Sequence, residues 1–328
     1  MLVTIIVFSP TGNTLKVGKM LEKSLLDRNA SVQLIDITRD RKAFHKHNIK
    51  SYLKENIRDH DVLCIGSPVY AHHLHYNVKK LIKSLPKLKN GWGKFSIPFV
   101  TYGGINSGIA LYEAAKLLKR SGRINIAGMK INSCHWFTQM KQVKIKVNDG
   151  LPGDEALPLI EDLVDRIIKL RNADFENCKD ISREFKYQTF GNRIKAHLIF
   201  REKFWQRHLY PELIFNYNKC RKCGKCVKVC PVQCIEMIRN GPIISKDHQS
   251  CIHCVSCILN CKFDAIYFNV NWSKWNKIIT KASKGHGFLA SNESPKSAVF
   301  PIRYTINNST ENYLYVREQY IPRPTVGR

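Results

Sequence analysis

Short apolar runs alternate with amphipathic stretches along the first 170 residues of the chain. Five runs have the length and the β-branched content of buried strands. They are Leu2–Phe8, Val32–Ile37, Val62–Ser67, Ile97–Tyr102 and Ile124–Ile131. Helical periodicity is found at Leu15–Leu26, Tyr76–Ser84, Ile109–Arg120 and Glu155–Leu170. The alternation predicts an α/β domain over residues 1–171, with a doubly wound, five-stranded parallel sheet covered by helices on both faces.

The pattern changes after residue 171. Residues 172–214 form a basic, aromatic-rich connector with helical periodicity in parts. Its apolar face suits docking of one domain on another, and an interfacial membrane helix is the alternative. Docking is favoured because such stripes usually pack inside the protein. Residues 215–269 are expected to form a small second domain. Residues 270–328 form a tail of unassigned role, with β-like alternation in Ile302–Tyr320.

Composition adds constraints on location and partners. No run of 18 apolar residues is present, and the start, MLVTIIVFSP, lacks the features of a secretory signal, so we expect a cytoplasmic protein. The chain has 53 Lys and Arg against 26 Asp and Glu, a formal net charge of +27. A basic surface attracts acidic partners of several kinds, so the charge alone selects none of them. A general preference for lysine explains it equally well.

The cysteines carry the strongest signal. Twelve cysteines in a chain expected in a reducing compartment indicate metal or redox chemistry in place of disulfides. Eight of them follow the spacing Cys-x2-Cys-x2-Cys-x3-Cys twice, with an offset of 31 residues. They are Cys220, Cys223, Cys226 and Cys230, then Cys251, Cys254, Cys257 and Cys261. The spacing is typical of [4Fe–4S] clusters, whereas structural zinc sites use paired Cys-x2-Cys units with a long spacer.

The remaining cysteines are predicted to be structural. Cys234 lies inside the first copy of the motif, and the repeat aligns it with Ala265 in the second copy. It therefore takes a small, buried position and is not expected to be a ligand. Cys64, Cys134 and Cys178 lie far from the motif and are expected to pack as small hydrophobic side chains.

A loop directly after the first predicted strand has the composition of a phosphate site. It contains Ser9, Pro10, Thr11, Gly12, Asn13 and Thr14. Hydroxyls and backbone N–H groups at the start of a helix can hold a phosphomonoester without a cationic side chain. The loop matches neither the GxxxxGK[ST] pattern of nucleotide triphosphatases nor the GxGxxG pattern of dinucleotide folds. The alternative is an ordinary capped turn that begins a helix.

Two further loops follow strands at the same edge of the predicted sheet, where parallel sheets bind ligands. They include Ser67, Pro68, Val69 and Tyr70 after the third strand, and Thr101, Tyr102, Gly103 and Gly104 after the fourth. Tyr70 and Tyr102 are candidates to flank a flat ring, or else ordinary core aromatics. The two glycines would let backbone amides approach the polar edge of the ring. His72, His73 and His75 could supply protons there, but histidines on a surface loop are more often solvated.

With these motifs, residues 1–170 resemble a flavodoxin and residues 215–268 resemble a clostridial-type two-cluster ferredoxin. The chain is thus similar to the flavodoxin–ferredoxin fusion proteins of anaerobes. The resemblance implies bound FMN, a 2-1-3-4-5 strand order and two [4Fe–4S] clusters. In two-cluster ferredoxins the fourth cysteine of each motif binds the other cluster. By this resemblance, Cys220, Cys223 and Cys226 pair with Cys261, and Cys251, Cys254 and Cys257 pair with Cys230.

The resemblance implies an electron-transfer protein or oxidoreductase that serves an acidic redox protein or reductase. One alternative is a self-contained flavoenzyme that reduces a quinone or a nitro compound. Another is a redox-sensing protein that binds nucleic acid. No dinucleotide fingerprint is visible, so no dedicated NAD(P)H site is predicted. Nucleic acid and peripheral membrane contact are the less favoured partners, and the basic charge departs from ordinary flavodoxins, which tend to be acidic.

Overall fold

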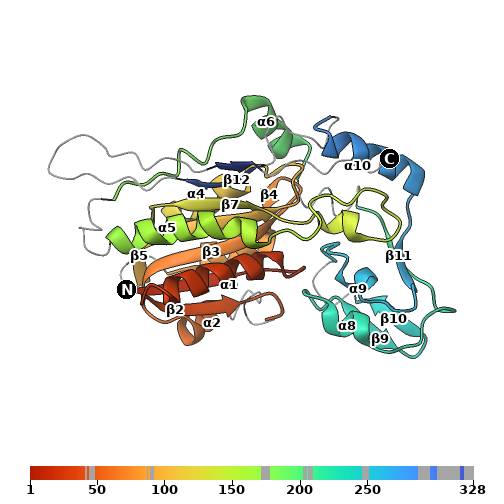
Figure 1. Cartoon of the computed structure of the whole chain (residues 1–328). Coiled ribbons are helices and arrows are strands. Elements are labelled where there is room, and N and C mark those ends of the chain that lie inside the picture. The colour runs from red at the N-terminus through yellow and green to blue at the C-terminus, as the bar shows by residue number, and fades with distance from the viewer. Residues whose placement is uncertain are drawn as a thin grey trace.

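The computed structural model describes residues 1–40, 43, 49–86, 88, 92–170, 178–201, 205, 210–245, 251–286, 296–300 and 318–320. A helix-covered sheet forms the larger body, and short helices and hairpins form a smaller body beside one end of that sheet (Figure 1).

Five parallel strands form the centre of the sheet. They are β1 Leu2–Val7, β2 Ser31–Asp36, β3 His60–Tyr70, β5 Trp92–Tyr102 and β7 Gly128–Asn132. Their spatial order is β2-β1-β3-β5-β7, and all four neighbouring pairs are parallel. Numbered one to five along the chain, these strands have the order 2-1-3-4-5. The predicted doubly wound fold is therefore confirmed.

The strand residues point alternately to two apolar layers, as a parallel sheet covered on both faces requires. Val3, Ile5 and Val7 pack with one pair of helices, whereas Ile6 and Phe8 pack on the opposite side. The first layer contains α1 Asn13–Leu26 and α5 Leu157–Leu170. The second contains α2 Ile49–Asn56, α3 Tyr76–Ser84 and α4 Ala110–Arg120. Two short strands, β4 His73–Leu74 and β6 Ile124–Asn125, pair with β3 and β5.

The edge of the sheet beside β7 is covered by a strand from the tail. β12, Lys296–Phe300, pairs antiparallel with β7, and β13, Glu318–Tyr320, pairs antiparallel with β12. Ser297 adds a side-chain contact at this edge, because its Oγ accepts a hydrogen bond from the Asn132 backbone N–H at 2.9 Å. Most of the stretch predicted to have β alternation, Ile302–Tyr320, lies outside the described residues.

The smaller body consists of two antiparallel strand pairs and two very short helices. β8 Leu213–Phe215 pairs with β11 Ile266–Phe268, so the first and last strands of this body lie side by side. β9 Ile235–Ile238 and β10 Gly241–Ile244 form a hairpin. The helices are α8 Lys225–Val229 and α9 Ser256–Leu259. Two longer helices flank the body in the sequence, α6 Phe190–Leu198 and α10 Trp272–Ser283.

The two bodies contact one another through aromatic side chains. Phe137, in a 3-10 turn after β7, packs against Phe268 of the smaller body and against Trp275 of α10, with ring centroids 6.2 and 5.2 Å apart. In the connector, Phe200 and Trp205 stack with centroids 5.1 Å apart. Phe200 also stacks on His72 of the larger body, with centroids 3.8 Å apart, and Tyr210 lies 4.7 Å from His253 of the smaller body, so connector aromatics contact both bodies. None of the described helices has the length and apolar composition needed to cross a bilayer.

Candidate functional site: two cysteine groups beside a loop cavity

The eight cysteines of the repeated motif lie around two small cavities of about 20 Å³ each. Group A comprises Cys220, Cys223, Cys226 and Cys261. Group B comprises Cys230, Cys251, Cys254 and Cys257. Each group takes three cysteines from one copy of the motif and the fourth from the other copy. The structure thus groups the cysteines as the resemblance to two-cluster ferredoxins implies, and their role as ligands stays a prediction.

The backbone repeats with the sequence. Lys222 and Gly224 in the first loop have positive φ angles of 51° and 72°, and the residues 31 positions later, His253 and Val255, have φ angles of 55° and 56°. A β-branched residue is rarely found there because its side chain crowds the backbone. These turns bring amides toward sulfur, since Lys222 N–H and His253 N–H each lie 3.4 Å from the Sγ of the cysteine two residues earlier. Such N–H donors favour a thiolate.

The sulfur spacing bears on the kind of metal centre. Among the described residues, no three His, Cys, Asp or Glu side chains come together closely enough for a single metal ion. In each group the cysteines line a small cavity, and the repeated spacing of these cysteines is that of [4Fe–4S] ligands.

Cys234 is buried beside group B. Its Sγ lies 3.6 Å from the Sγ of Cys230, and its own backbone N–H donates to the same sulfur at 3.3 Å. The contact with Cys230 raises the pKa of the Cys234 thiol and lowers the pKa of Cys230. The contact thus favours the protonated form of Cys234 next to a prospective ligand. Cys64 and Cys178 are also buried, and burial raises the pKa of their thiols to about 12 and about 11.

The Ser9–Thr14 loop wraps the start of α1 in a defined conformation. Gly12 has a φ angle of 89°, which favours glycine, and a Cβ placed there would meet nothing within 4 Å. Ser9 Oγ accepts the Leu15 N–H at 2.9 Å, so this hydroxyl serves as a local cap. The capped turn weighed for this loop is therefore present. The first amides of α1 still lack intrahelical acceptors, as at every helix start, and can bind an anion.

The structure brings the three predicted loops together. Thr14 Oγ1 and Thr101 Oγ1 lie 2.8 Å apart and join the first loop to the third. Pro68 is the register partner of Thr101, so the second loop leaves the sheet at the same level. A cavity of about 150 Å³, here called the loop cavity, lies beyond this edge. Its lining includes Val69, Tyr70, Gly103, Asn106, His135 and Trp136.

Two aromatic rings in the lining of the loop cavity are parallel. Tyr70 and Trp136 have an interplanar angle of 15° and centroids 6.3 Å apart. Two stacking contacts of about 3.5 Å each require about 7 Å, so this spacing is close to that of a slot for a flat ring. Tyr102 is placed differently: it does not line the cavity, and the Lys130 ammonium lies 5.9 Å from its ring.

Polar atoms without partners face this region. In the described part of the chain, Asn106 Nδ2, His135 Nδ1 and Asn148 Nδ2 are buried and lack hydrogen-bond partners. Asn106 and His135 line the loop cavity, and a Cβ on Gly104 would lie 2.2 Å from Asn148 Nδ2. The glycine at 104 is thus required by the packing of Asn148. Buried donors normally have acceptors, so these atoms suit the polar edge of a bound heterocycle.

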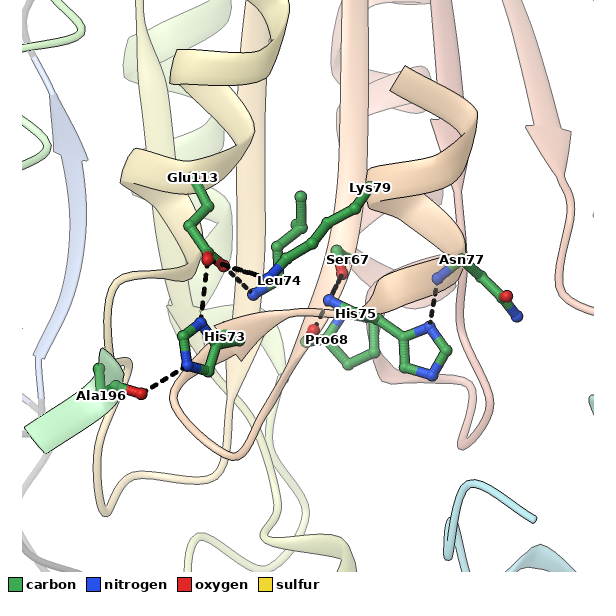
Figure 2. Close-up of polar contacts among 9 residues, drawn as sticks. All are labelled: Ser67, Pro68, His73, Leu74, His75, Asn77, Lys79, Glu113 and Ala196. Carbon is green, nitrogen blue, oxygen red and sulfur yellow. Dashed lines mark hydrogen bonds and ion pairs between the residues drawn. The ribbon is translucent and has the colours of Figure 1, made fainter. Parts of the chain in front are cut away.

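The three histidines are buried, and the expectation of a solvated histidine loop is wrong. Their exposed fractions are 8%, 6% and 0% for His72, His73 and His75. Figure 2 shows His73 between Glu113 of α4 and the carbonyl of Ala196, with its ring nitrogens 2.9 and 2.8 Å from those oxygens. The turn between β3 and β4 buries these rings because it folds back toward α4 and α6.

His75 has a separate role from His73. Its Nδ1 accepts the Asn77 N–H at 3.2 Å and so caps α3 (Figure 2). The ring lies 4.4 Å from Phe8 and 4.9 Å from Tyr70, measured between centroids. Burial lowers the pKa of both His72 and His75 to about 3, so both are neutral at pH 7. Neither is a ready proton donor at that pH.

Group B is the cysteine group that adjoins the loops. Ser256, between Cys254 and Cys257, donates its hydroxyl hydrogen bond to the carbonyl of Pro10 at 3.0 Å. A row of aromatic rings also leads from the loop cavity to the group B loop. Trp205 contacts Tyr210 at 5.9 Å, and Tyr210 contacts His253 at 4.7 Å.

The sequence of the smaller body matches a known domain family. Residues 219–268 match the profile described as a 4Fe-4S dicluster domain. This segment is a ferredoxin-type domain. A curated relative, the iron-sulfur cluster-binding subunit of a menaquinone reductase from Nitratidesulfovibrio vulgaris, is 42% identical over 64 residues. The match covers 18% of this chain and 25% of the relative, so the chain spans about a quarter of the length of that protein.

Several solved structures are similar to about half of the chain. An archaeal flavodoxin has 20% identity, covers 52% of this chain and 100% of its own, and has a TM-score of 0.36. An oxidised flavodoxin from Bacillus cereus has 15% identity, coverages of 52% and 98%, and a TM-score of 0.37. The apo form of an NADH:FMN oxidoreductase has 18% identity, coverages of 53% and 92%, and a TM-score of 0.40. The flavodoxin-like fold is therefore assigned from this chain's own strand order.

Several site residues carry no clear sequence signal. Trp136, His135 and Asn148 come from the segment after β7, which the sequence analysis left without a role. An aromatic residue shortly after the fifth strand is the signal that could have pointed to Trp136, because loops at that edge converge. Asn148 lies 16 residues beyond β7, and only the folded segment brings it against Gly104 of the third loop.

Proposed function

We propose that this chain is an electron-transfer oxidoreductase in which two [4Fe–4S] clusters exchange electrons with an FMN held by the three loops. The observation that carries the proposal is the contact between Ser256 and Pro10, because it joins the group B loop to the loop proposed to hold the phosphate. The flavodoxin-like strand order and the dicluster family match support a flavin and iron–sulfur clusters.

The residues of the loop cavity fit a flavin. The amides at the start of α1 and the hydroxyls of Thr11 and Thr14 would hold the phosphate. Tyr70 and Trp136 would stack on the two faces of the ring, and Asn106 and His135 would hydrogen-bond its polar edge. When bound, a flavin accepts electrons singly or in pairs, whereas each cluster carries one. The protein's part is to fix these groups at short range and to exclude water.

The two cysteine groups differ in exposure, and this difference indicates which group exchanges electrons with the partner and which with the flavin. In group A, Cys223 is exposed, whereas in group B, Cys254 and Cys257 are buried. Group A would therefore face the partner, and group B would face the flavin. Exposed Arg221, Lys222 and Lys225 lie within or beside the group A loop. Their charge favours an acidic redox protein as the partner that docks here.

Anaerobic purification tests the proposal. We expect a brown protein that contains about eight iron atoms and eight acid-labile sulfides per chain, with one releasable FMN. Rapid mixing with a reduced electron carrier should bleach cluster absorbance before flavin absorbance. Colourless protein, zinc in place of iron, or FAD in place of FMN would each contradict a named part of the proposal. Reduction of the flavin at an unchanged rate in a Cys223→Ser, Cys226→Ser variant would exclude group A from the path.

A second candidate is direct reduction of a small acceptor such as a quinone. It is favoured by the largely apolar lining of the loop cavity, which includes Phe200, Trp205 and Ile279 in addition to residues that follow β3 and β5. The matched relative is named as a subunit of a menaquinone reductase, and the match covers 25% of that protein. Sustained turnover of a soluble quinone, driven by a reduced ferredoxin without any other protein, would favour this candidate.

A further inference from the structure

Helix α6 exposes its large apolar side chains and buries small or polar ones, the opposite of an ordinary surface helix. The side that faces the protein carries small or polar residues, Asn192 and Ala196, which are both buried. The Ala196 carbonyl accepts the hydrogen bond of His73 described above. The outer side carries Phe190 and Leu198, which are 70% and 71% exposed. Amphipathic helices normally bury their large apolar side chains. The exposed apolar face of α6 therefore indicates a surface for interaction.

The exposed apolar residues form one stripe. Phe190, Ile194 and Leu198 are spaced four residues apart and so lie along the same face of the helix. Ile194 is 41% exposed, and Ile199, directly after the helix, is 48% exposed. Figure 1 shows α6 at the outer margin of the molecule, away from the centre of the sheet. The docking role expected for the connector's apolar face is therefore filled by residues outside this stripe, such as Phe200.

The charged side chains around the stripe have one sign. Between residues 183 and 201, the exposed charged residues are all basic, and they are Arg183, Lys186, Lys195 and Arg201. The sequence continues this bias, with seven Lys and Arg against two Asp and Glu between residues 183 and 207. A stripe of large apolar residues bordered by cations matches the surface of a bilayer that contains anionic lipids.

We propose that the α6 stripe, defined as Phe190, Ile194, Leu198 and Ile199, docks the protein on an anionic membrane surface. A helix of nine residues is about 13 Å long, far less than a bilayer is thick, so it would lie in the plane of the headgroups. The exposed border charges are two Lys and two Arg, and a border of cations alone is complementary to a surface of anionic headgroups. The long stems of these side chains can cover apolar surface while their charged groups reach the phosphates.

Vesicle sedimentation with the full chain tests the proposal. We expect binding to phosphatidylcholine vesicles that contain phosphatidylglycerol, and at least about tenfold weaker binding to phosphatidylcholine alone or at high salt. A Phe190→Ser, Leu198→Ser variant should lose about tenfold or more of the binding. The matched control is Leu26→Ser, Ile238→Ser, because these residues are 52% and 43% exposed and lie on other elements. The control should bind like the unchanged protein.

Three results would overturn the proposal. The first is equal binding by the stripe variant and the control variant, and the second is no binding to anionic vesicles. The third is self-association in sedimentation velocity that the stripe variant abolishes while vesicle binding persists, which would assign the stripe to a second copy of the chain. Circular dichroism of both variants checks folding, and unchanged thermal transitions are expected because the substituted side chains are exposed.

Discussion

At the scale of single residues, His72 and His75 combine burial with neutrality. Both have a pKa of about 3 in the folded chain, caused first by burial. An unfolded histidine has a pKa of about 6.5. Below that pH the unfolded chain therefore binds protons at these positions, whereas the folded residues stay neutral. The contribution of the two neutral histidines to folding stability is therefore fully present above pH 6.5, and it is lost as the pH falls from that value toward 3.

A prediction for His75 follows from this linkage. As the pH falls from 6 to 4, each such histidine should lower the free energy of unfolding by about 1.4 kcal/mol per pH unit. His75→Asn retains a side chain that can cap α3, and it should reduce the slope of stability against pH by about that amount. Urea titrations at a series of pH values measure the slope. An identical slope in the variant would show that His75 is protonated in the folded chain.

Cys234 provides a second prediction at this scale. If it donates to Cys230 without binding iron, Cys234→Ala should retain about eight irons per chain, as alanine occupies the repeated position at 265. Loss of the S–H donor should lower the reduction potential of the group B cluster, because hydrogen bonds to sulfur stabilise the reduced state. A redox titration monitored by electron paramagnetic resonance measures this reduction potential. Loss of half the iron would identify Cys234 as a ligand.

The residue scale also shows where sequence reasoning stopped. The repeated local spacing identified the eight cysteines, and the resemblance to two-cluster ferredoxins implied their division into two groups, each with its fourth cysteine from the other copy. Trp136 and His135 could not be assigned in this way, since their position depends on how the segment after β7 folds across the loops. The histidines were misjudged because the sequence places them in a turn, and only the fold shows that the turn is covered by α4 and α6.

At the scale of elements, Glu113 of α4 holds the turn that carries Tyr70. Its carboxylate accepts from His73, from the Leu74 N–H at 2.9 Å and from the Lys79 ammonium at 2.9 Å (Figure 2). Burial opposes the charge, but these donors together lower the pKa of Glu113. A single carboxylate thus fixes β4 and the start of α3 relative to α4.

Substitution of Glu113 should therefore loosen this turn. We expect Glu113→Gln to reduce the free energy of unfolding by about 1–3 kcal/mol, because three donors lose a charged acceptor. It should also weaken flavin binding, since Tyr70 would no longer be held in place. Urea unfolding and flavin titration measure the two effects. The matched control is Glu55→Gln on the exposed side of α2, with an expected change within about 0.5 kcal/mol.

The sequence predicted the strands and main helices of the larger body well. The apolar runs at the cores of β1, β3 and β5 are long and β-branched, so their pattern is unambiguous. The helix α2 and the strand β12 were not predicted. α2 has only eight residues, and β12 lies between β13 and β7, of which β7 lies more than 160 positions earlier. Such a pairing leaves no local trace in the sequence.

At the scale of the whole molecule, exposed cations lie beside the cysteine group where electrons are proposed to enter. Reversal of two exposed cations beside group A, in a Lys222→Glu, Lys225→Glu variant, should slow reduction by an acidic carrier by about tenfold or more at low ionic strength. The difference should shrink at high salt. Stopped-flow kinetics measure it. Lys23→Glu, Lys54→Glu has the same change in net charge on α1 and α2, and it should leave the rate nearly unchanged. Equal slowing by both variants would contradict a docking face at group A.

The strand β12 has a consequence for how the chain is made. The ferredoxin domain lies in the sequence between β7 and the strand that covers the edge of β7. During synthesis from the N-terminus, that edge must wait for the whole ferredoxin domain to emerge. An open edge is a template for pairing with other chains. Slow delivery of iron and sulfide to the nascent protein should therefore increase aggregation of the flavin half, although that half contains no predicted cluster ligand.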